Sequence, residues 1–347
     1  MRWCCFDAPS VTEKDRPNSQ QDLRRLSSSE NITVFSYGEL RAATNNFHPC
    51  NKLGQGGFGT VYKGTLKNGA PVATKVLSAE SKQGVHEFLT EIKILTNVKH
   101  PNLVELIGCC IQGSTRILVY EYLENNSLDR ALRGSDGEIG KLNWSMRSSI
   151  CMGTARGLAF LHEELEPQIV HRDIKASNIL LDRNFTPKIG DFGLARLFPD
   201  DTTHISTCVA GTTFGMLALE IVSGRSISKA NWSEQEKFLL EWAWQLYEEG
   251  NLIELVDPNL KEYLEEEVLR YIKVALFCTQ AATKQRPTMP QVVEMLSKQV
   301  RLNEKELTPP RLVQDLRHTS GGWKAGESTN VPPPSSATVT YSELVPR

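Results

Sequence analysis

The chain has 347 residues, of which 40% are hydrophobic and 23% charged, so it can bury a large core in one two-lobed domain or two small domains with tails. Its net charge of −2 provides no field that would attract nucleic acid or an anionic membrane. The eight cysteines contain no C-x-x-C pair and follow no secretory signal, so we expect reduced thiols in a cytoplasmic protein without disulfides or zinc.

The first 34 residues are an expected disordered leader, because residues 7–34 have too little apolar content to offset the entropy of ordering. Cys4 and Cys5 are candidates for reversible palmitoylation, which would give peripheral association with the plasma membrane. Arg2 stands where N-myristoylation requires glycine, and one lipid signal anchors weakly. The alternative, two incidental thiols in a frayed terminus, stays open.

Residues 35–46 are expected to form a short helix ahead of the domain, which starts at residue 47. A G-x-G-x-x-G pattern follows, which dinucleotide-binding folds share. In those folds the glycines open a helix. In this chain Val61 continues the pattern as a strand, and residues 72–75 supply a second strand. Because glycine lacks a Cβ atom, the backbone can close over phosphates. We predict an ATP lid lined by Leu53, Gly54, Gln55, Gly56, Gly57, Phe58, Gly59 and Val61.

In the second strand, Ala73 and Lys75 share one face while Thr74 points the other way. Ala73 is therefore expected to cover the adenine ring, and the Lys75 amine to reach the α- and β-phosphates. Thr74 resembles valine in shape but carries a hydroxyl that needs a partner if it is buried.

Further along the chain, an amphipathic helix over 84–98 carries Glu91 beside its apolar stripe. A solvated glutamate is the alternative, since charged side chains are mostly exposed. Strands are expected at 103–109, 117–122 and 185–190. Helices are expected at 128–132, 146–162, 234–249, 265–280 and 289–302, before a disordered tail over 303–347.

One stretch carries most of the chemistry: His171-Arg172-Asp173-Ile174-Lys175-Ala176-Ser177-Asn178, followed by Asp191-Phe192-Gly193. It combines two carboxylates, an amine and an amide, which is the set needed to orient a hydroxyl and hold Mg²⁺ on a triphosphate. Either motif alone could be a charged surface turn. Both motifs in this order and at this spacing favour phosphoryl transfer.

With these motifs the chain resembles the eukaryotic protein kinase family over about residues 35 to 300. More narrowly, it is similar to plant receptor-like cytoplasmic kinases in Phe35-Ser36-Tyr37-Gly38-Glu39-Leu40, Ala43-Thr44-Asn45-Asn46-Phe47, Leu118-Val119-Tyr120-Glu121-Tyr122 and Asn126-Ser127-Leu128. The resemblance implies an α+β bilobal fold. Its N-lobe (47–123) would be a small antiparallel sheet with helix αC, and its C-lobe (124–302) would be mainly helical.

The resemblance also implies roles for individual residues. Asp173 would be the base that orients the substrate hydroxyl, Lys175 would touch the transferred phosphate, and Lys75 would pair with Glu91. Asn178 and Asp191 would hold Mg²⁺. The adenine edge would meet backbone groups of Glu121 and Leu123, with Tyr120 as gatekeeper. A lysine two residues after Asp173 is typical of serine/threonine kinases, and Arg172 would pair with a phosphorylated residue among Thr202, Thr203, Ser206, Thr207, Thr212 and Thr213.

The family pattern breaks after Thr213. The family continues through G-Y-L-A-P-E, a variable stretch and D-V-Y-S-F-G, whereas this chain passes directly to Phe214 and L-E-I-V-S-G-R, so about thirty residues are absent. Reading 215–220 as an altered G-Y-L-A-P-E is the alternative, but no D-x-x-S-x-G follows it. A deletion would leave Arg286 without its glutamate and the catalytic loop without the aspartate that braces it from the start of helix αF, a severe loss of stability.

Two functions therefore remain. The first is an ATP- and Mg²⁺-dependent serine/threonine kinase for protein substrates, impaired by the gap and acting below an upstream membrane receptor kinase. The second is a non-catalytic, pseudokinase-like nucleotide-binding or regulatory fragment that competes with full-length kinases for partners. Only phosphate transfer to a peptide separates them.

Overall fold

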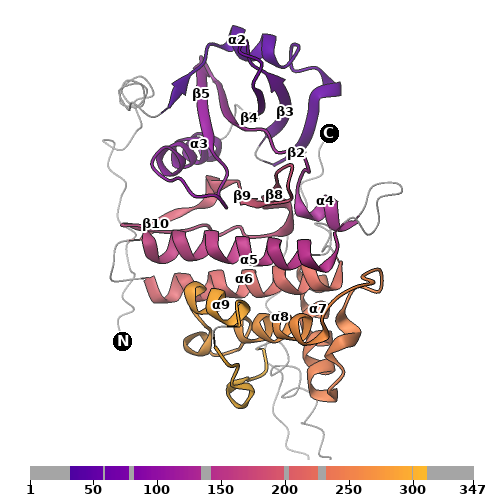
Figure 1. The fold of residues 1–347 in the computed structure, drawn as a ribbon. Helices are drawn as coiled ribbons and strands as arrows, with labels where there is room; N and C mark the ends of the chain where they lie inside the picture. Colours follow the sequence, from indigo (N-terminus) through magenta and orange to yellow (C-terminus); the bar gives the residue numbers. More distant parts are fainter. Residues whose placement is uncertain are drawn as a thin grey trace, which may run out of the picture.

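A computed structural model describes residues 32–57, 59–77, 82–133, 142–198, 203–225, 232–298 and 300–310, without the side chains of 82, 83, 203–210 and 232–237. Figure 1 shows a small lobe built on a β-sheet above a larger helical lobe. The predicted α+β bilobal fold is confirmed.

The small lobe contains a six-stranded sheet in the order β1-β5-β6-β4-β3-β2, antiparallel throughout except for the parallel β1–β5 pair. Alternating and β-branched residues such as Val72 and Val76 favour these strands. The strands are β1 (Thr33–Val34), β2 (Lys52–Gly56), β3 (Gly59–Thr65), β4 (Pro71–Leu77), β5 (Leu106–Gln112) and β6 (Thr115–Glu121).

Two helices cover the sheet, one for each face. Helix α3 (Lys82–Leu95) packs Phe88 and Ile92, both fully buried, into the main core of the protein. Helix α2 (Tyr37–Ala43) belongs to a second, separate hydrophobic cluster around Leu40. The sheet is therefore a layer between two apolar interfaces.

The large lobe is a stack of helices. In Figure 1, α5 and α6 run side by side beneath the small lobe, and α8 and α9 lie below them. Short strand pairs β7–β10 and β8–β9 lie above α5 and carry the loop with His171. The elements are α4 (Leu128–Arg133), α5 (Trp144–Ala159), β7 (Gln168–Val170), β8 (Ile179–Leu181), β9 (Pro187–Ile189), β10 (Arg196–Phe198), α6 (Thr203–Ser223), α7 (Trp232–Glu249), α8 (Glu265–Cys278) and α9 (Met289–Leu296).

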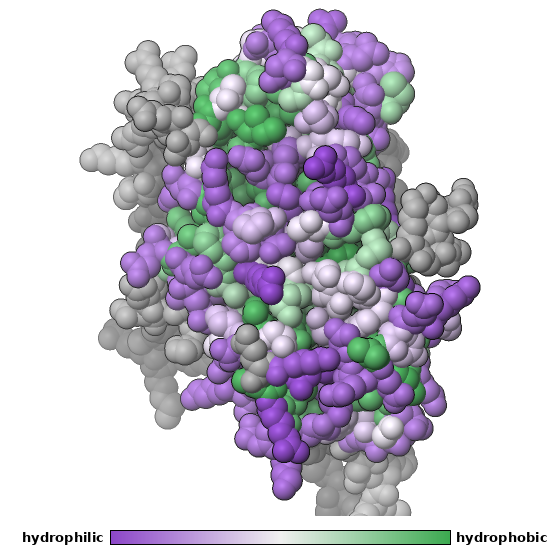
Figure 2. All heavy atoms as spheres, in the orientation of Figure 1, coloured by the Kyte–Doolittle hydropathy of each residue, from purple (hydrophilic) through white to green (hydrophobic). Residues whose placement is uncertain are grey.

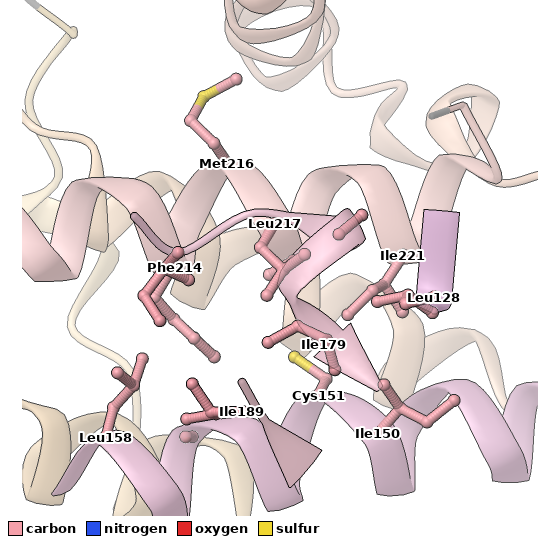
Figure 3. Packing of buried hydrophobic residues seen from close by; sticks show 14 of the residues in the cluster. Leu128, Ile150, Cys151, Leu158, Ile179, Ile189, Phe214, Met216, Leu217 and Ile221 are labelled. Carbon is pink, nitrogen blue, oxygen red and sulfur yellow. The ribbon is translucent and has the colours of Figure 1, made fainter. Parts of the chain in front are cut away.

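Helix α6 is the main departure from the expected structure. Figure 3 shows Phe214, Leu217 and Ile221 pointing towards α5, while Met216 points away from it. Gly215 lets α6 approach α8, because a Cβ atom there would lie 2.8 Å from the Ala275 carbonyl oxygen. Every residue of α6 from Phe214 to Ser223 is buried, as expected for a helix segment surrounded by core.

The residues from Thr203 to Thr213, several of them candidate phosphorylation sites, form the first half of α6, where no helix was expected. No proline interrupts the stretch before Phe214, and a helix extends more easily from an existing turn than it starts anew. The buried second half of α6 is therefore a template on which the preceding residues continue as helix.

The surface in the orientation of Figure 1 is mostly hydrophilic, and its hydrophobic residues gather mainly at the upper left, on the small lobe (Figure 2). Large exposed apolar side chains such as Val34 and Leu264 lie in different lobes. Within the described residues, none of the helices combines the length and the apolar character needed to cross a bilayer.

Thr74 is fully buried, and its hydroxyl has no hydrogen-bond partner in the part of the chain that the structure describes. Replacing it by valine keeps the shape and removes the unpaired hydroxyl, so Thr74→Val should raise the unfolding free energy by about 1 kcal/mol. Urea denaturation measures this. Thr65→Val, at an exposed position of β3, is the control and should change stability by less than about 0.5 kcal/mol. A loss of stability in Thr74→Val would show that the hydroxyl is hydrogen-bonded in solution.

Candidate active site

Three charged side chains meet between the lobes. The Lys75 amine of β4 lies 3.1 Å from a Glu91 carboxylate oxygen of α3 and 2.8 Å from an Asp191 carboxylate oxygen. The second Glu91 oxygen accepts a hydrogen bond from the Phe192 amide at 3.3 Å. The predicted Lys75–Glu91 ion pair is confirmed, and Glu91 is buried, not solvated.

The charges in this cluster reinforce one another. Burial alone would lower the pKa of the Lys75 amine, but Glu91 and Asp191 outweigh it and hold that pKa above its usual value. Burial likewise opposes ionisation of Asp191, and Lys75 reverses this, so the pKa of Asp191 is lowered. The lysine is therefore cationic and Asp191 is anionic, as binding of a phosphate and a metal ion requires.

Backbone geometry presents Asp191 to this cluster. Asp191 has φ +65°, a left-handed conformation that aspartate tolerates better than most residues. The next residue, Phe192, is fully buried and packs edge-on against His171 with ring centroids 4.7 Å apart. The His171 Nε2 atom lies 3.0 Å from the Gly190 carbonyl oxygen, and its Nδ1 accepts from the Asp173 amide at 3.3 Å. His171 thus connects the two motifs.

Asp173 is held by its neighbours in the loop. Its carboxylate accepts hydrogen bonds from the Lys175 amine at 2.5 Å and from the Asn178 amide nitrogen at 2.9 Å, and its carbonyl accepts a second bond from Asn178 at 2.8 Å. The nitrogen of Asn178 is engaged in this way, so its amide oxygen is the atom available to a cation. Asn178 and Asp191 offer oxygen ligands of the kind that Mg²⁺ prefers, so the donor set fits this ion.

A cavity of about 710 Å³ lies between the lobes beside these groups. The β2–β3 hairpin covers it, and Gly59 has φ +139°, where a Cβ atom would lie 2.2 Å from the Val76 carbonyl oxygen, so only glycine fits. The predicted residues on its wall are Leu53, Gly54, Gln55, Gly56, Gly57, Gly59, Val61, Ala73, Lys75, Glu91, Glu121, Leu123, Lys175, Asn178 and Asp191.

Two predicted residues are not on this wall. Phe58 lies outside the described residues, and Asp173 lies next to the cavity through its bonds to Lys175 and Asn178. Other wall residues were given no role from the sequence, although Tyr122, Asn126 and Ser127 stand in the quoted family motifs. They come from the segment between β6 and α4, from α4 itself and from α6. The only sequence feature that could have indicated them is their position in or next to the quoted motifs, including L-E-I-V-S-G-R: Tyr122, Asn126, Ser127, Asp129, Arg130, Arg133 and Glu220.

Among the predicted regulatory residues, the structure describes the side chains of Arg172, Thr212 and Thr213. Arg172 is exposed, and Thr202 lies outside the described residues. Thr203, Ser206 and Thr207 belong to the backbone of α6, and their side chains are not described. Thr212 lies farther along α6, where its hydroxyl accepts a 2.6 Å hydrogen bond from the Arg286 guanidinium.

Arg286 was expected to be buried and to have lost its glutamate partner. It is half-buried, and its guanidinium forms hydrogen bonds to other groups. It donates to the Gln280 carbonyl oxygen at 2.7 Å as well as to Thr212. The Thr212 hydroxyl is thus one of the acceptors of the Arg286 guanidinium in this chain.

Comparison with known proteins agrees with this geometry. Residues 47–233 match the family model described as protein tyrosine and serine/threonine kinase. The chain is 49% identical over 311 residues to cold-responsive protein kinase 1 of Arabidopsis thaliana, covering 83% of this chain and 80% of that protein. It is also 49% identical to a probable leucine-rich-repeat receptor-like serine/threonine-protein kinase of the same plant, covering 84% of this chain but only 30% of that receptor. The chain therefore belongs to the eukaryotic protein kinase family, among its plant serine/threonine kinases.

Proposed function

We propose that this chain binds Mg-ATP between its lobes and transfers the γ-phosphate to serine or threonine hydroxyls of proteins, slowly because its substrate side is altered. The observation that carries the proposal is the Lys75–Glu91–Asp191 cluster on the wall of the cavity. When bound, Mg²⁺ supplies positive charge that neutralises the transferred phosphoryl group.

The residues of the chain divide the remaining tasks. Lys75, held by Glu91, would bind the α- and β-phosphates, and Asn178 and Asp191 would hold the metal. The Asp173 carboxylate, which accepts a hydrogen bond from Lys175, would accept the proton of the substrate hydroxyl, and Lys175 would bind the transferred phosphate. Backbone groups of Glu121 and Leu123 would bind the adenine edge. Catalysis then consists mainly of positioning and charge.

A second function, a non-catalytic nucleotide-binding regulator, is favoured by helix α6. In this chain the residues on both sides of Gly211 are helical, whereas the resemblance implies that the family builds the support for the substrate hydroxyl from residues after this glycine. A chain that binds nucleotide but presents no such support would compete with full-length kinases for partners. The kinase proposal also includes protein substrates, an upstream receptor kinase and membrane association through Cys4 and Cys5. Both cysteines lie outside the described residues.

Nucleotide binding is tested by thermal unfolding. Mg-ATP should raise the Tm, because a ligand that binds only the folded state stabilises it by about 2.7 kcal/mol when its concentration is one hundred times its Kd. Lys75→Met should abolish this shift in Tm. Lys99→Met, which removes an exposed lysine paired with Glu105 outside the cavity, is the control that should retain it. An unchanged shift in Lys75→Met would place the nucleotide elsewhere. Phosphate transfer to a peptide, absent in Asp173→Asn, then separates the kinase from the regulator.

A further inference from the structure

The motif that spans 35–47 precedes the matched family region, which starts at residue 47, and catalysis does not explain it. In the structure, residues 32–47, here called the N-terminal strap, run from the edge of the small-lobe sheet, where β1 lies, onto its outer face, against which α2 packs. Strand β1 pairs with β5, and the Phe35 amide donates to the Cys109 carbonyl oxygen at 2.8 Å. Gly108 makes room for this contact, since a Cβ atom there would lie 2.2 Å from the Thr33 oxygen and 2.5 Å from the Phe35 ring.

Helix α2 forms the middle of the strap. It starts with a capping box, in which Ser36 and Glu39 each bond the other's backbone amide. Leu40 is fully buried in the second hydrophobic cluster, which also contains the fully or nearly fully buried Val72, Cys110, Ile117 and Val119. These residues belong to β4, β5 and β6, so the strap binds several strands from outside.

The far end of the strap leads into the ATP lid. Asn45, Asn46 and Phe47 all have positive φ, between +51° and +59°, and form a sharp turn. The Asn51 amide holds this turn through a 3.0 Å bond to the Thr44 carbonyl oxygen, and β2 begins at the following residue. The Phe47 ring also contacts Tyr62 of β3 at 5.6 Å between centroids. Both strands of the lid hairpin are therefore attached to the strap.

Strand β4 lies between the strap and the cavity. Val72 and Val76 belong to the cluster on the strap side. Ala73 and Lys75 alternate with them and lie on the cavity wall. A change on the strap side therefore acts on the strand that positions the Lys75 amine.

We infer that the strap is a positioning element for nucleotide binding, with Leu40 as its anchoring residue: when it is docked, the lid hairpin and Lys75 are held in binding geometry, and its release lowers the affinity for Mg-ATP. The inference rests on the proposed function and adds a means of regulating it. Anything that competes with the strap for the outer face of the sheet would act on ATP affinity without touching the cavity.

The test uses the full chain with Leu40→Asp, which places a charge in the cluster, and Gly108→Ala, a milder change that removes the space for Thr33 and Phe35. Faster tryptic cleavage after Arg41 reports release of the strap. The Kd for Mg-ATP, measured by calorimetry well below the Tm, should rise about tenfold or more in both variants. Gly38→Ala is the matched control, because a Cβ atom there meets nothing within 4 Å. It should leave the Kd unchanged.

A strap with a merely structural role would lower the Tm of the variants but leave the Kd of the folded protein for Mg-ATP unchanged. A Kd within twofold of that of the unaltered protein, together with faster cleavage at Arg41, therefore overturns the inference. If Leu40→Asp does not fold, Gly108→Ala decides. Unaltered protein that binds no Mg-ATP would overturn the proposed function together with the inference, whereas equal affinities overturn the inference alone.

Discussion

Inserting the family's missing segment, about thirty residues, between Thr213 and Phe214 should raise autophosphorylation by orders of magnitude. The nucleotide side of the site is already assembled around Lys75. The substrate side is not, because residues that would support the incoming hydroxyl are part of α6. A reacting group misplaced by about 1 Å can cost a hundredfold in rate.

The comparison is made at matched folded concentration with radiolabelled ATP. The restored protein carrying Asp173→Asn should be inactive, which excludes a contaminating kinase. The Kd for Mg-ATP should be similar in the short and restored proteins, because the cavity wall consists almost entirely of residues before Thr213. Equal activity in the short and restored chains would show that the gap is tolerated, and the regulatory function would then be dropped.

The nucleotide side could be predicted from the sequence because its residues stand in motifs that resemble the family's, and local rules orient several of them. Strand alternation places Ala73 and Lys75 on one face, and helical spacing turns Glu91 inward. The bond from Asn178 to Asp173 spans only five residues, within one loop. Each of these contacts depends on short-range geometry and on a spacing that is visible in the chain.

Other features could not be predicted, because they depend on distant partners. Residues 203–213 are rich in Thr, Ser, Val and Gly, which are poor helix formers, and their helix depends on the packing of the apolar residues that follow. Strand β1 has two residues and no pattern of its own, so only its pairing with β5 reveals it. Likewise, the contact of Thr212 with Arg286 joins residues 74 positions apart.

The second large effect is expected at the other end of α6, where Arg147 of α5 forms a buried ion pair with Asp257. The guanidinium lies 2.5 Å from the carboxylate and also donates to the carbonyl oxygens of Ile221 and Leu142, at 2.9 and 3.0 Å. The side chains of Arg147 and Asp257 are only 3% and 9% exposed. Removing one partner of such a pair leaves a buried charge, so Arg147→Met should lower the unfolding free energy by about 3 to 5 kcal/mol.

The matched control is Arg133→Met, which breaks an exposed pair with Asp129 four residues away and should cost less than about 1 kcal/mol. Adding Asp257→Asn to Arg147→Met removes the stranded charge and should recover part of the loss. Urea denaturation of the three variants and the unaltered protein measures these differences. A loss below about 1 kcal/mol in Arg147→Met would mean that water solvates Asp257 when the arginine is absent.

The same pair predicts a dependence on pH. Burial raises the pKa of Asp257, but hydrogen bonds from Asn259 and Arg147 outweigh it and hold that pKa below its usual value. A carboxylate with a lowered pKa stabilises the fold above its unfolded pKa, about 3.9, and this contribution is lost as the pH falls through the folded pKa. In Arg147→Met the unpaired carboxylate becomes neutral on protonation. The difference in unfolding free energy between the variant and the unaltered protein should therefore be largest near pH 7 and become smaller below about pH 4. A difference that stays constant with pH would mean that lost packing, not charge, causes it.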